Sequence, residues 1–132
     1  MMRPEHPLAQ KKMTLKTYCD AQHLLVSAHG GTHEWIDDIL AERGRTRYVA
    51  LTTSTYGATP LVLEATDLIM ACPRRMGVTF KDRLGLAIAD CPVPPPPKFR
   101  SVDMIWHARL SSHPAQIWIR QLLRDVAQST EA

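Results

Sequence analysis

The sequence predicts an α/β fold, in which helices pack on both faces of a small parallel sheet to form three layers. Four short apolar runs alternate with amphipathic segments along residues 18–91, and strands linked through helices favour parallel pairing. None of the runs alternates polar and apolar residues, which is typical of strands buried on both faces. The four predicted strands are residues 23–27, 48–52, 68–72 and 86–89.

Proline, glycine and hydroxyl-bearing residues mark the ends of three helices between these strands. Thr32 is expected to cap the first helix, and Gly44 is expected to end it. Thr59 is expected to cap the second, because Pro60 follows it at a position where helices accept proline. The predicted helices are residues 34–43, 60–65 and 73–84.

A run of prolines, PVPPPPK at residues 92–98, follows the fourth strand. Proline has no backbone N–H and favours an extended polyproline conformation, so we expect a stiff connector here. Beyond it, the pattern predicts a strand over residues 102–107 and a helix over residues 114–128. The helix has one apolar face with the spacing of a buried stripe: Ala115, Trp118, Ile119, Leu122, Leu123 and Val126.

Composition and charge argue against several classes of protein. Sixteen basic and thirteen acidic residues give a net charge of +3, and the densest basic group is Arg43, Arg45 and Arg47. We interpret that group as a solvated loop rather than a nucleic-acid surface. The three cysteines have no repeated spacing, and no apolar run approaches a membrane span or a signal peptide. We therefore expect a soluble, cytoplasmic protein without membrane contact.

The turn after the first strand, VSAHGGT, carries the glycine pair Gly30 and Gly31. It lacks both the three glycines of a dinucleotide fingerprint and the Gly-Lys-Ser/Thr of a P-loop. Free amides beside the hydroxyls of Ser27 and Thr32 could bind a carboxylate. A tight turn capped by Thr32 explains the same residues equally well, so both interpretations stay open.

Histidines and cysteines do not predict a metal site or a catalytic site. His29 and His33 are four residues apart, but His29 precedes the helix, so the spacing does not place both on one face. Cys72 lies before Pro73 and two arginines, a setting that favours a thiolate. No histidine stands beside it as a base, and we interpret it as a small apolar residue at a strand end. We predict no metal, no cofactor and no enzymatic activity.

The loop TTSTYGAT, residues 52–59, is the stronger candidate for ligand binding. It follows a predicted strand directly, and ligands of open parallel sheets bind beyond the carboxyl ends of strands. Ser54, Thr55 and Tyr56 could supply hydrogen bonds and an aromatic face to a small polar or aromatic ligand. A hydroxyl-rich cap for the next helix explains Thr59 but not Tyr56.

Four segments of the sequence, in order, resemble LysR-type transcriptional regulators. They are RPEHPLA, HLLVS, VALTTSTYGATPLVLEATDLIMACPRR and MIWHARLSSHPAQIWIRQLL, and together they span Arg3 to about Ala127. The resemblance is closest to the branch that senses aromatic carboxylates. It implies the type II periplasmic-binding-protein-like fold, with two lobes and the effector in the cleft between them.

The resemblance also implies how the chain is divided. Residues 1–17 correspond to a crossover from a first lobe, and residues 18–91 to the second lobe. Residues 92–101 correspond to the return crossover, and residues 102–132 to the final strand and helix of the first lobe. The family's DNA-binding domain is absent, so we expect a truncated part of a longer regulator. The family's last helix often starts with Asp-Pro; here His113 precedes Pro114, and Ser112 is the alternative cap.

By resemblance, the chain is an effector-binding module that binds a small molecule, makes no DNA contact itself and forms a homo-oligomer. An apolar stripe on the helix after the glycine turn resembles a dimer interface: Trp35, Ile36, Ile39 and Leu40. Two alternatives remain: a fragment without independent activity, and a small cysteine-dependent enzyme. The expected effector-binding residues are Ser27, His29, Ser54, Thr55, Tyr56, Cys72 and Pro73, with Trp106 and His107 as lesser candidates because Trp106 is more often a core residue.

Overall fold

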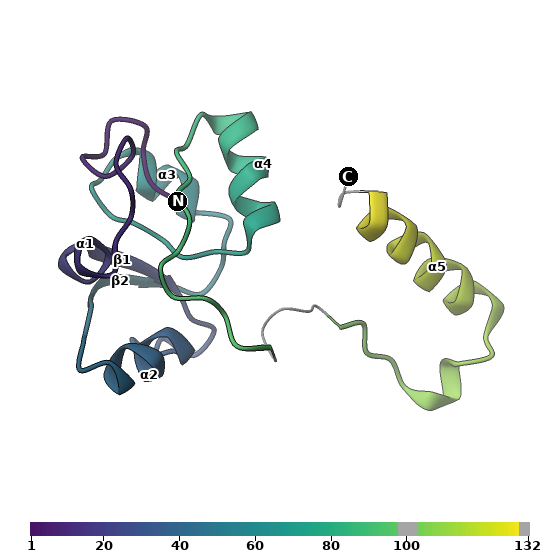
Figure 1. Cartoon of the computed structure of the whole chain (residues 1–132). Coiled ribbons are helices and arrows are strands. Elements are labelled where there is room, and N and C mark those ends of the chain that lie inside the picture. The colour runs from purple at the N-terminus through teal and green to yellow at the C-terminus, as the bar shows by residue number, and fades with distance from the viewer. Residues whose placement is uncertain (98–102, 130–132) are drawn as a thin grey trace. The chain divides into compact units, whose positions relative to one another are not determined.

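A computed structural model of the chain describes residues 1–97 and 103–129 (Figure 1). The chain divides into two compact units, Met1–Pro95 and Pro96–Ala132. The boundary between the units falls within the proline run. Each unit has its own elements, and the sheet belongs to the first.

The sheet of the first unit consists of two parallel strands. Strand β1 is Gln22–Val26 and strand β2 is Tyr48–Thr53, and both confirm the predicted runs. The three central residues of β1 are buried, as its apolar sequence predicts. In contrast, β2 is largely exposed, with Tyr48 66% and Leu51 41% accessible. It therefore lies at the edge of the sheet, next to β1.

The other two predicted strands are reduced to single bridges. Ile69 pairs in parallel with His23, and its N–H donates to Gln22 O at 2.9 Å. Ala87 pairs only with Met2, in the antiparallel direction. Neither segment pairs for long enough to form a strand. The prediction of a four-stranded parallel sheet is therefore wrong in extent, and in direction for the fourth segment.

The first two residues of the chain lie between these two bridged segments. Met1 N donates to Met70 O at 2.9 Å, and Met70 N donates to Met1 O at 2.9 Å. On the other side, Met2 N donates to Ala87 O at 3.0 Å and Ala87 N to Met2 O at 2.8 Å. The hydrogen-bonded order is thus β2, β1, 69–70, 1–2 and 87. Residues 1–2 therefore lie between the third and fourth predicted strands, although they are far from both in the sequence.

Four helices belong to the first unit. They are α1 Leu15–Asp20, α2 Trp35–Glu42, α3 Thr59–Glu64 and α4 Arg74–Leu84. Helix α1 was not predicted, although Thr14 caps it by accepting a hydrogen bond from the N–H of Thr17 at 3.2 Å. A capping threonine in a short polar segment is easily mistaken for a turn, because the helix has only six residues.

Helix α2 starts later than predicted. Its N-cap is Glu34, not Thr32, and the Asp37 carboxylate accepts a hydrogen bond from the Glu34 N–H at 2.8 Å. Thr32 lies two residues before that cap, so its hydroxyl does not cap the first turn. Gly44 follows the helix with φ 63°, and its N–H donates to Ala41 O at 2.9 Å. The predicted end of the helix is confirmed, because glycine adopts positive φ without strain.

Helix α3 begins at Thr59 itself, and its N-cap is Ala58. Thr59 is fully buried, and its hydroxyl donates to Tyr56 O at 2.8 Å. The expected Thr59 cap is therefore wrong: the side chain fixes the preceding loop instead. Pro60 lies in the first turn as predicted, and α4 begins directly after Pro73.

The hydrophobic core of the first unit consists of two clusters, one on each face of the ladder. Residues that are neighbours in sequence along residues 1–2 and 69–70 pack in different clusters. Met1 and Met70 pack in one cluster with Leu63 of α3, and residues of α4 pack against that cluster. Met2 and Ile69 pack in the other. This second cluster also contains Tyr18 of α1, Ile36 and Leu40 of α2, and Val93. Helices α3 and α4 thus cover one face of the ladder, and α1 and α2 cover the other (Figure 1).

The second unit contains a 3₁₀ turn, η2 Ala108–Leu110, and helix α5 Pro114–Ser129. Residues 103–107 form no strand, which corrects the predicted strand; Val102 lies outside the described residues. The helix is confirmed. Across residues 1–97 and 103–129, no helix is long and apolar enough to cross a membrane.

Candidate functional site

The carboxyl ends of β1 and β2 meet at one edge of the sheet. Val26 pairs in register with Thr53, and Ser27 N donates to Thr53 O at 2.8 Å. Ser27 is half-buried, whereas Ser54 and Thr55 are exposed. The structure therefore brings the predicted hydroxyls of two loops to the same edge, where a ligand can reach them.

Tyr56 lies beside these hydroxyls with 39% of its surface exposed. Burial raises the pKa of its phenol, and the charges of Glu34 and Cys72 raise it further. Tyr56 belongs to the second of the two loops that meet at this edge.

The two histidines of the glycine turn are surface residues. His29 is exposed, and His33 Nε2 lies 2.7 Å from Asp38 Oδ1 in an exposed pair. Within the described ranges, no three His, Cys, Asp or Glu side chains are grouped so that they could hold a metal ion. His29 can thus contribute to the edge only as a polar side chain.

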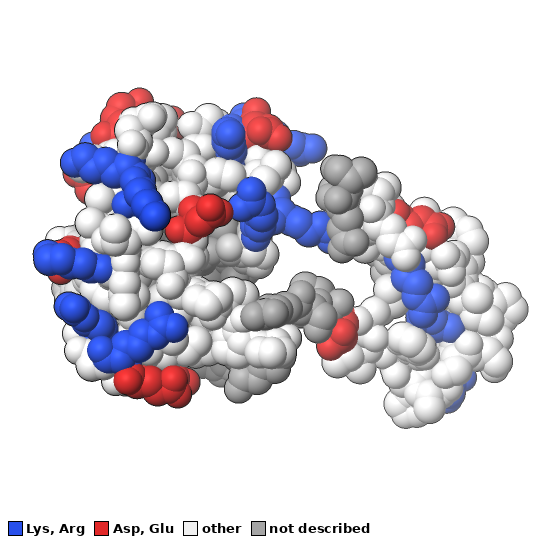
Figure 2. All heavy atoms as spheres, viewed as in Figure 1, with Lys and Arg blue, Asp and Glu red and all other residues white. Residues whose placement is uncertain are grey.

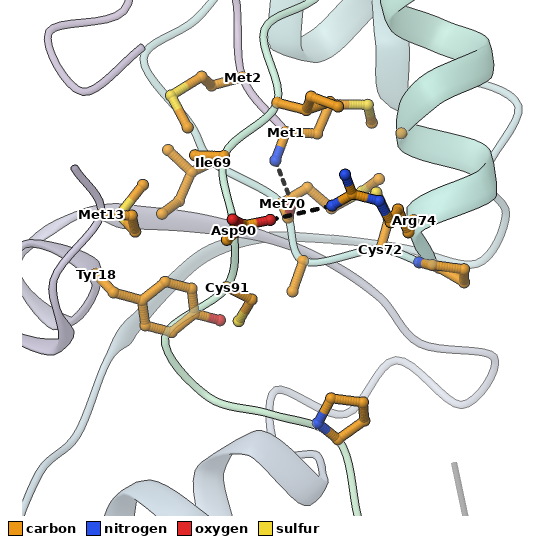
Figure 3. Close-up of a pocket in the computed structure, with 16 residues that line it drawn as sticks. Met1, Met2, Met13, Tyr18, Ile69, Met70, Cys72, Arg74, Asp90 and Cys91 are labelled. Carbon is orange, nitrogen blue, oxygen red and sulfur yellow. Dashed lines mark hydrogen bonds and ion pairs between the residues drawn. The ribbon is translucent and has the colours of Figure 1, made fainter. Parts of the chain in front are cut away.

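A cavity of about 510 Å³ lies in the first unit (Figure 3). Its walls come from residues 1–2, from the segment between Ile69 and Gly77, and from the segment between Ile88 and Cys91. Cys72 and Pro73, both predicted from the strand-end rule, line it. Of the predicted site residues in the first unit, only Cys72 and Pro73 belong to the cavity lining.

The Cys72 thiol is not set up as a nucleophile. Burial raises its pKa above the ordinary value for a cysteine, and a nearby Cys91 raises it further. A backbone hydrogen bond from Gly77 acts in the opposite direction without reversing the shift. A raised pKa leaves the thiol protonated at neutral pH, and the thiol form is a poor nucleophile.

A single ion pair lies at the cavity wall. Arg74 Nη1, at the start of α4, lies 3.0 Å from Asp90 Oδ1 (Figure 3). Both side chains are well exposed, at 77% and 95%, so the attraction between them is screened by water. Arg74 and Asp90 are the two charged side chains among the lining residues. Neither residue was predicted from the sequence to belong to the site.

A buried polar network lies on the face of the sheet that α1 and α2 cover. The Arg47 guanidinium donates to both oxygens of Asp37, at 2.8 and 2.9 Å, and to Tyr18 Oη at 3.3 Å. The Arg47 side chain is 1% exposed. Burial opposes ionisation of Asp37, but the hydrogen bond from Arg47 prevails and lowers the pKa of the carboxyl. The prediction of a solvated loop is therefore wrong for Arg47, which fixes the start of α2.

His23 is a second buried polar residue that the sequence analysis missed. Its Nε2 lies 2.8 Å from Tyr18 O, and its ring packs edge-on against the Tyr18 ring at 4.6 Å. Its Nδ1 is buried without a partner among the described residues. Burial lowers the pKa of His23 to about 4, so the ring is neutral at physiological pH. A histidine at the start of an apolar strand could have indicated this position.

Trp106 and His107 belong to the second unit and have local partners there. Trp106 is 40% exposed; its Nε1 donates to Ser111 Oγ at 3.2 Å, and the Arg120 guanidinium lies 4.6 Å from the ring centre. His107 Nδ1 accepts a hydrogen bond from Arg109 N at 3.1 Å. The expectation that Trp106 is a core residue is wrong, because a cation–π contact covers one face of a partly exposed ring.

The residues expected at a dimer interface divide into two groups. Ile36 and Leu40 are 2% and 0% exposed, within the second core cluster. Both are therefore core residues, which corrects the expectation for them. Trp35 and Ile39 are half-buried against the same cluster and keep some accessible surface.

Basic and acidic side chains are interspersed on the face of the molecule shown in Figure 2. A nucleic-acid surface usually presents a basic patch or stripe of one sign. This face shows no such patch.

Helices cover both faces of a short ladder, and polar loops lie at one of its edges. This arrangement defines the class of the protein, a ligand-binding α/β domain. The profile of the LysR substrate binding domain matches residues 1–128. The chain therefore belongs to the LysR substrate-binding-domain family, and is the effector-binding domain of a LysR-type regulator. Members of this family regulate transcription and are not enzymes, so the cysteine-dependent alternative is excluded.

Similar proteins include two transcriptional activators. The HTH-type transcriptional activator NahR of Pseudomonas putida is 30% identical over 126 residues, which cover 96% of this chain and 41% of NahR. The HTH-type transcriptional activator NagR of a Ralstonia species is 31% identical over 122 residues, which cover 92% of this chain and 40% of NagR. The chain spans about two fifths of the length of these relatives.

Solved structures agree with this family. The regulatory domain of MexT, a transcriptional activator of Pseudomonas aeruginosa, superposes with a TM-score of 0.67 at 26% identity, over 86% of this chain and 56% of that one. A transcriptional regulator from Vibrio parahaemolyticus has a TM-score of 0.72 at 24% identity, over 98% of this chain and 59% of that one. The second match shows the fold alone, which is periplasmic-binding-protein-like.

Proposed function

We propose that this domain binds a small aromatic carboxylate at the carboxyl edge of its sheet. The binding residues are Ser27 and His29 after β1, Ser54, Thr55 and Tyr56 after β2, and Cys72 and Pro73 at the cavity. Hydroxyls and amides orient the carboxylate, and the Tyr56 ring supplies an apolar face.

The observation that carries this proposal is the meeting of the loops after β1 and β2 at one edge, with Tyr56 exposed in the second loop. The same unit holds a cavity of about 510 Å³, lined in part by Cys72 and Pro73, and together these features match a site for a small aromatic molecule. The cavity volume lies within the range of about 300–1,000 Å³ that is usual for small-molecule sites. The resemblance to the aromatic-carboxylate branch of the family supports the same ligand class.

The proposal extends to partners and location. We place the protein in the cytoplasm, as part of a regulator that acts as a homo-oligomer, with Trp35 and Ile39 at the edge of a contact between copies. We also propose that this domain makes no specific contact with DNA; the face shown in Figure 2, where basic side chains form no stripe, is consistent with this. A gel shift with operator DNA at physiological salt, with competitor, is expected to give no complex.

Salicylate titration, followed by NMR of the ¹⁵N-labelled chain, tests the binding site. Shift changes are expected at Ser27, Ser54 and Tyr56, with weak affinity. The affinity is weak because the open edge covers one side of a ligand, whereas a tight pocket encloses about 70–90% of the ligand surface. Low-micromolar affinity would mean that the site is more enclosed than the described residues show.

Two tyrosines of the same strand region give a matched pair of variants. Tyr56→Leu is expected to abolish the shift changes, because it removes the phenol and the aromatic face. Tyr48→Leu is the control: Tyr48 is 66% exposed at the amino end of β2, far from the proposed edge. Equal effects of the two variants contradict the proposed site. The absence of any shift favours the alternative of a fragment without independent activity.

A further inference from the structure

We propose that Arg74 anchors the carboxylate of the effector, and that Asp90 occupies this anchor when the effector is absent. The inference rests on the proposed function and names the residues that select for a negatively charged ligand. Effector binding then exchanges one carboxylate for another: the Arg74–Asp90 pair opens, and an Arg74–ligand pair forms.

The residues that line the cavity include two charged side chains, and much of the rest is apolar or sulfur-bearing. Arg74 and Asp90 are the two charged side chains, and they contact each other at 3.0 Å. Much of the remaining lining is apolar or sulfur-bearing, including Met1, Met70 and Cys72. Thioethers and thiols make favourable contacts with aromatic rings because sulfur is polarisable. Such a cavity suits a molecule with an aromatic body and one negative group.

The position of Arg74 favours an anion for a second reason. Arg74 is the first residue of the eleven-residue helix α4, and Pro73 before it has no side chain that could cap the first turn. The start of a helix carries a partial positive charge, which adds to that of the guanidinium. A guanidinium also binds carboxylates in a two-pronged geometry that a neutral amide cannot replace.

Exchange is feasible because the existing ion pair is weak. Both partners are well exposed, at 77% and 95%, and exposed pairs contribute little to stability. A ligand that enters the cavity presents its carboxylate to Arg74, which lines the cavity. Asp90 then returns to water without leaving a buried charge. Asp90 therefore lowers the apparent affinity without blocking the site.

The test compares salicylate with its neutral analogue salicylamide, in the full chain at constant ionic strength. Arg74→Gln is expected to weaken salicylate binding about tenfold and to leave salicylamide unchanged, because a charge-assisted hydrogen bond is lost only with the acid. Asp90→Asn is expected to tighten salicylate binding about two- to fivefold, since the internal competitor is gone. The matched control is Asp67→Asn, which breaks the ion pair between Arg3 and Asp67, whose N–O distance is 2.8 Å. Neither residue lines the cavity, so both affinities are expected to stay unchanged.

The outcomes separate this inference from the proposed function. If the NMR shift changes that salicylate causes at Tyr56 persist unchanged in Arg74→Gln, then Arg74 does not anchor the carboxylate. The proposed function still stands in that case. An equal loss for salicylate and salicylamide assigns Arg74 a structural role and also overturns its role as the anchor. Unchanged or weaker salicylate binding by Asp90→Asn overturns the role of Asp90. No binding of either ligand by the parent chain overturns both proposals.

Discussion

Helices α2 and α5 are both amphipathic, yet they use their apolar residues in opposite ways. In the first unit, Ile36 and Leu40 of α2 are buried almost completely. In the second unit, Trp118 and Leu122 of α5 are 65% and 42% exposed. The sequence pattern predicts both helices equally well. Whether a stripe becomes core depends on what packs against it, and helical spacing carries no information about that.

The polar residues of the two units differ in the same way. Arg47 of the first unit has a side chain that is 1% exposed, and besides Asp37, ten residues away, it reaches Tyr18, 29 residues away. Arg120 of the second unit is also buried, but it donates to the carbonyls of Leu110 and Ser111 only nine or ten residues earlier. The first unit is thus held together by contacts between distant segments, and the described part of the second by local ones.

The largest expected effect comes from truncating one leucine in each helix. Leu40→Ala is expected to lower the free energy of unfolding by about 2–5 kcal/mol, because it leaves a cavity in the core. Leu122→Ala is expected to change it by much less, about 0.5 kcal/mol, since Leu122 is 42% exposed and lies outside the core clusters. Urea denaturation followed by circular dichroism measures both. Similar losses in the two variants would show that α5 is covered in solution.

A smaller effect is expected from pH, and it acts only on the first unit. His23 has a pKa of about 4 in the folded chain, against 6.5 as its ordinary value. The unfolded chain therefore takes up a proton first as pH falls, so stability is full above pH 6.5 and declines toward pH 4. Between pH 7.5 and pH 5 the expected loss is about 2 kcal/mol.

Two histidine variants isolate this contribution. His23→Phe keeps an aromatic ring against Tyr18 and is expected to remove the His23 share of the pH dependence in urea denaturation. His113→Gln alters an exposed histidine of the second unit, and the pH dependence is expected to stay as in the parent chain. A parental pH profile in His23→Phe would mean that other groups cause the acid sensitivity.

The smallest expected effect concerns association between copies of the chain. An exposed stripe of leucine, tryptophan and valine on α5 favours self-association, since covering each side chain is worth about 1.5–3 kcal/mol when complete. Leu123→Lys is expected to shift the onset of association, measured by light scattering, to higher concentration. Leu61→Lys is the control, because Leu61 is 71% exposed on α3 of the first unit. A parent chain that stays monomeric at high micromolar concentration would contradict this expectation.

Elements with local signals were predictable from the sequence. Strands β1 and β2 are apolar runs, and helix α2 ends at Gly44 because the backbone there takes a positive φ. The segments around Ile69 and Ala87 were predicted as full strands because their composition is that of strands. Their actual extent depends on pairing with residues 1–2, about 70 to 85 positions away, and no local pattern reports such a partner.

The same distinction applies to the candidate site. Cys72 and Pro73 were predicted to belong to it because they follow an apolar run, and they do line the cavity. Arg74 and Asp90 were not predicted, because an ion pair that spans sixteen residues leaves no trace in sequence spacing. Arg47 was misread for the same reason: in sequence, a buried arginine before a strand looks like its exposed neighbours.

The insertion of residues 1–2 into the middle of the ladder has a consequence for how the first unit forms during synthesis. Residues 1–2 acquire their outer partner only when Ala87 has been made. Until then the half-built sheet has one unpaired edge, and closing it brings together ends that are far apart along the chain. Contacts of such long range slow folding. The nascent unit should therefore stay open, and vulnerable to proteases, until nearly all of its residues have emerged.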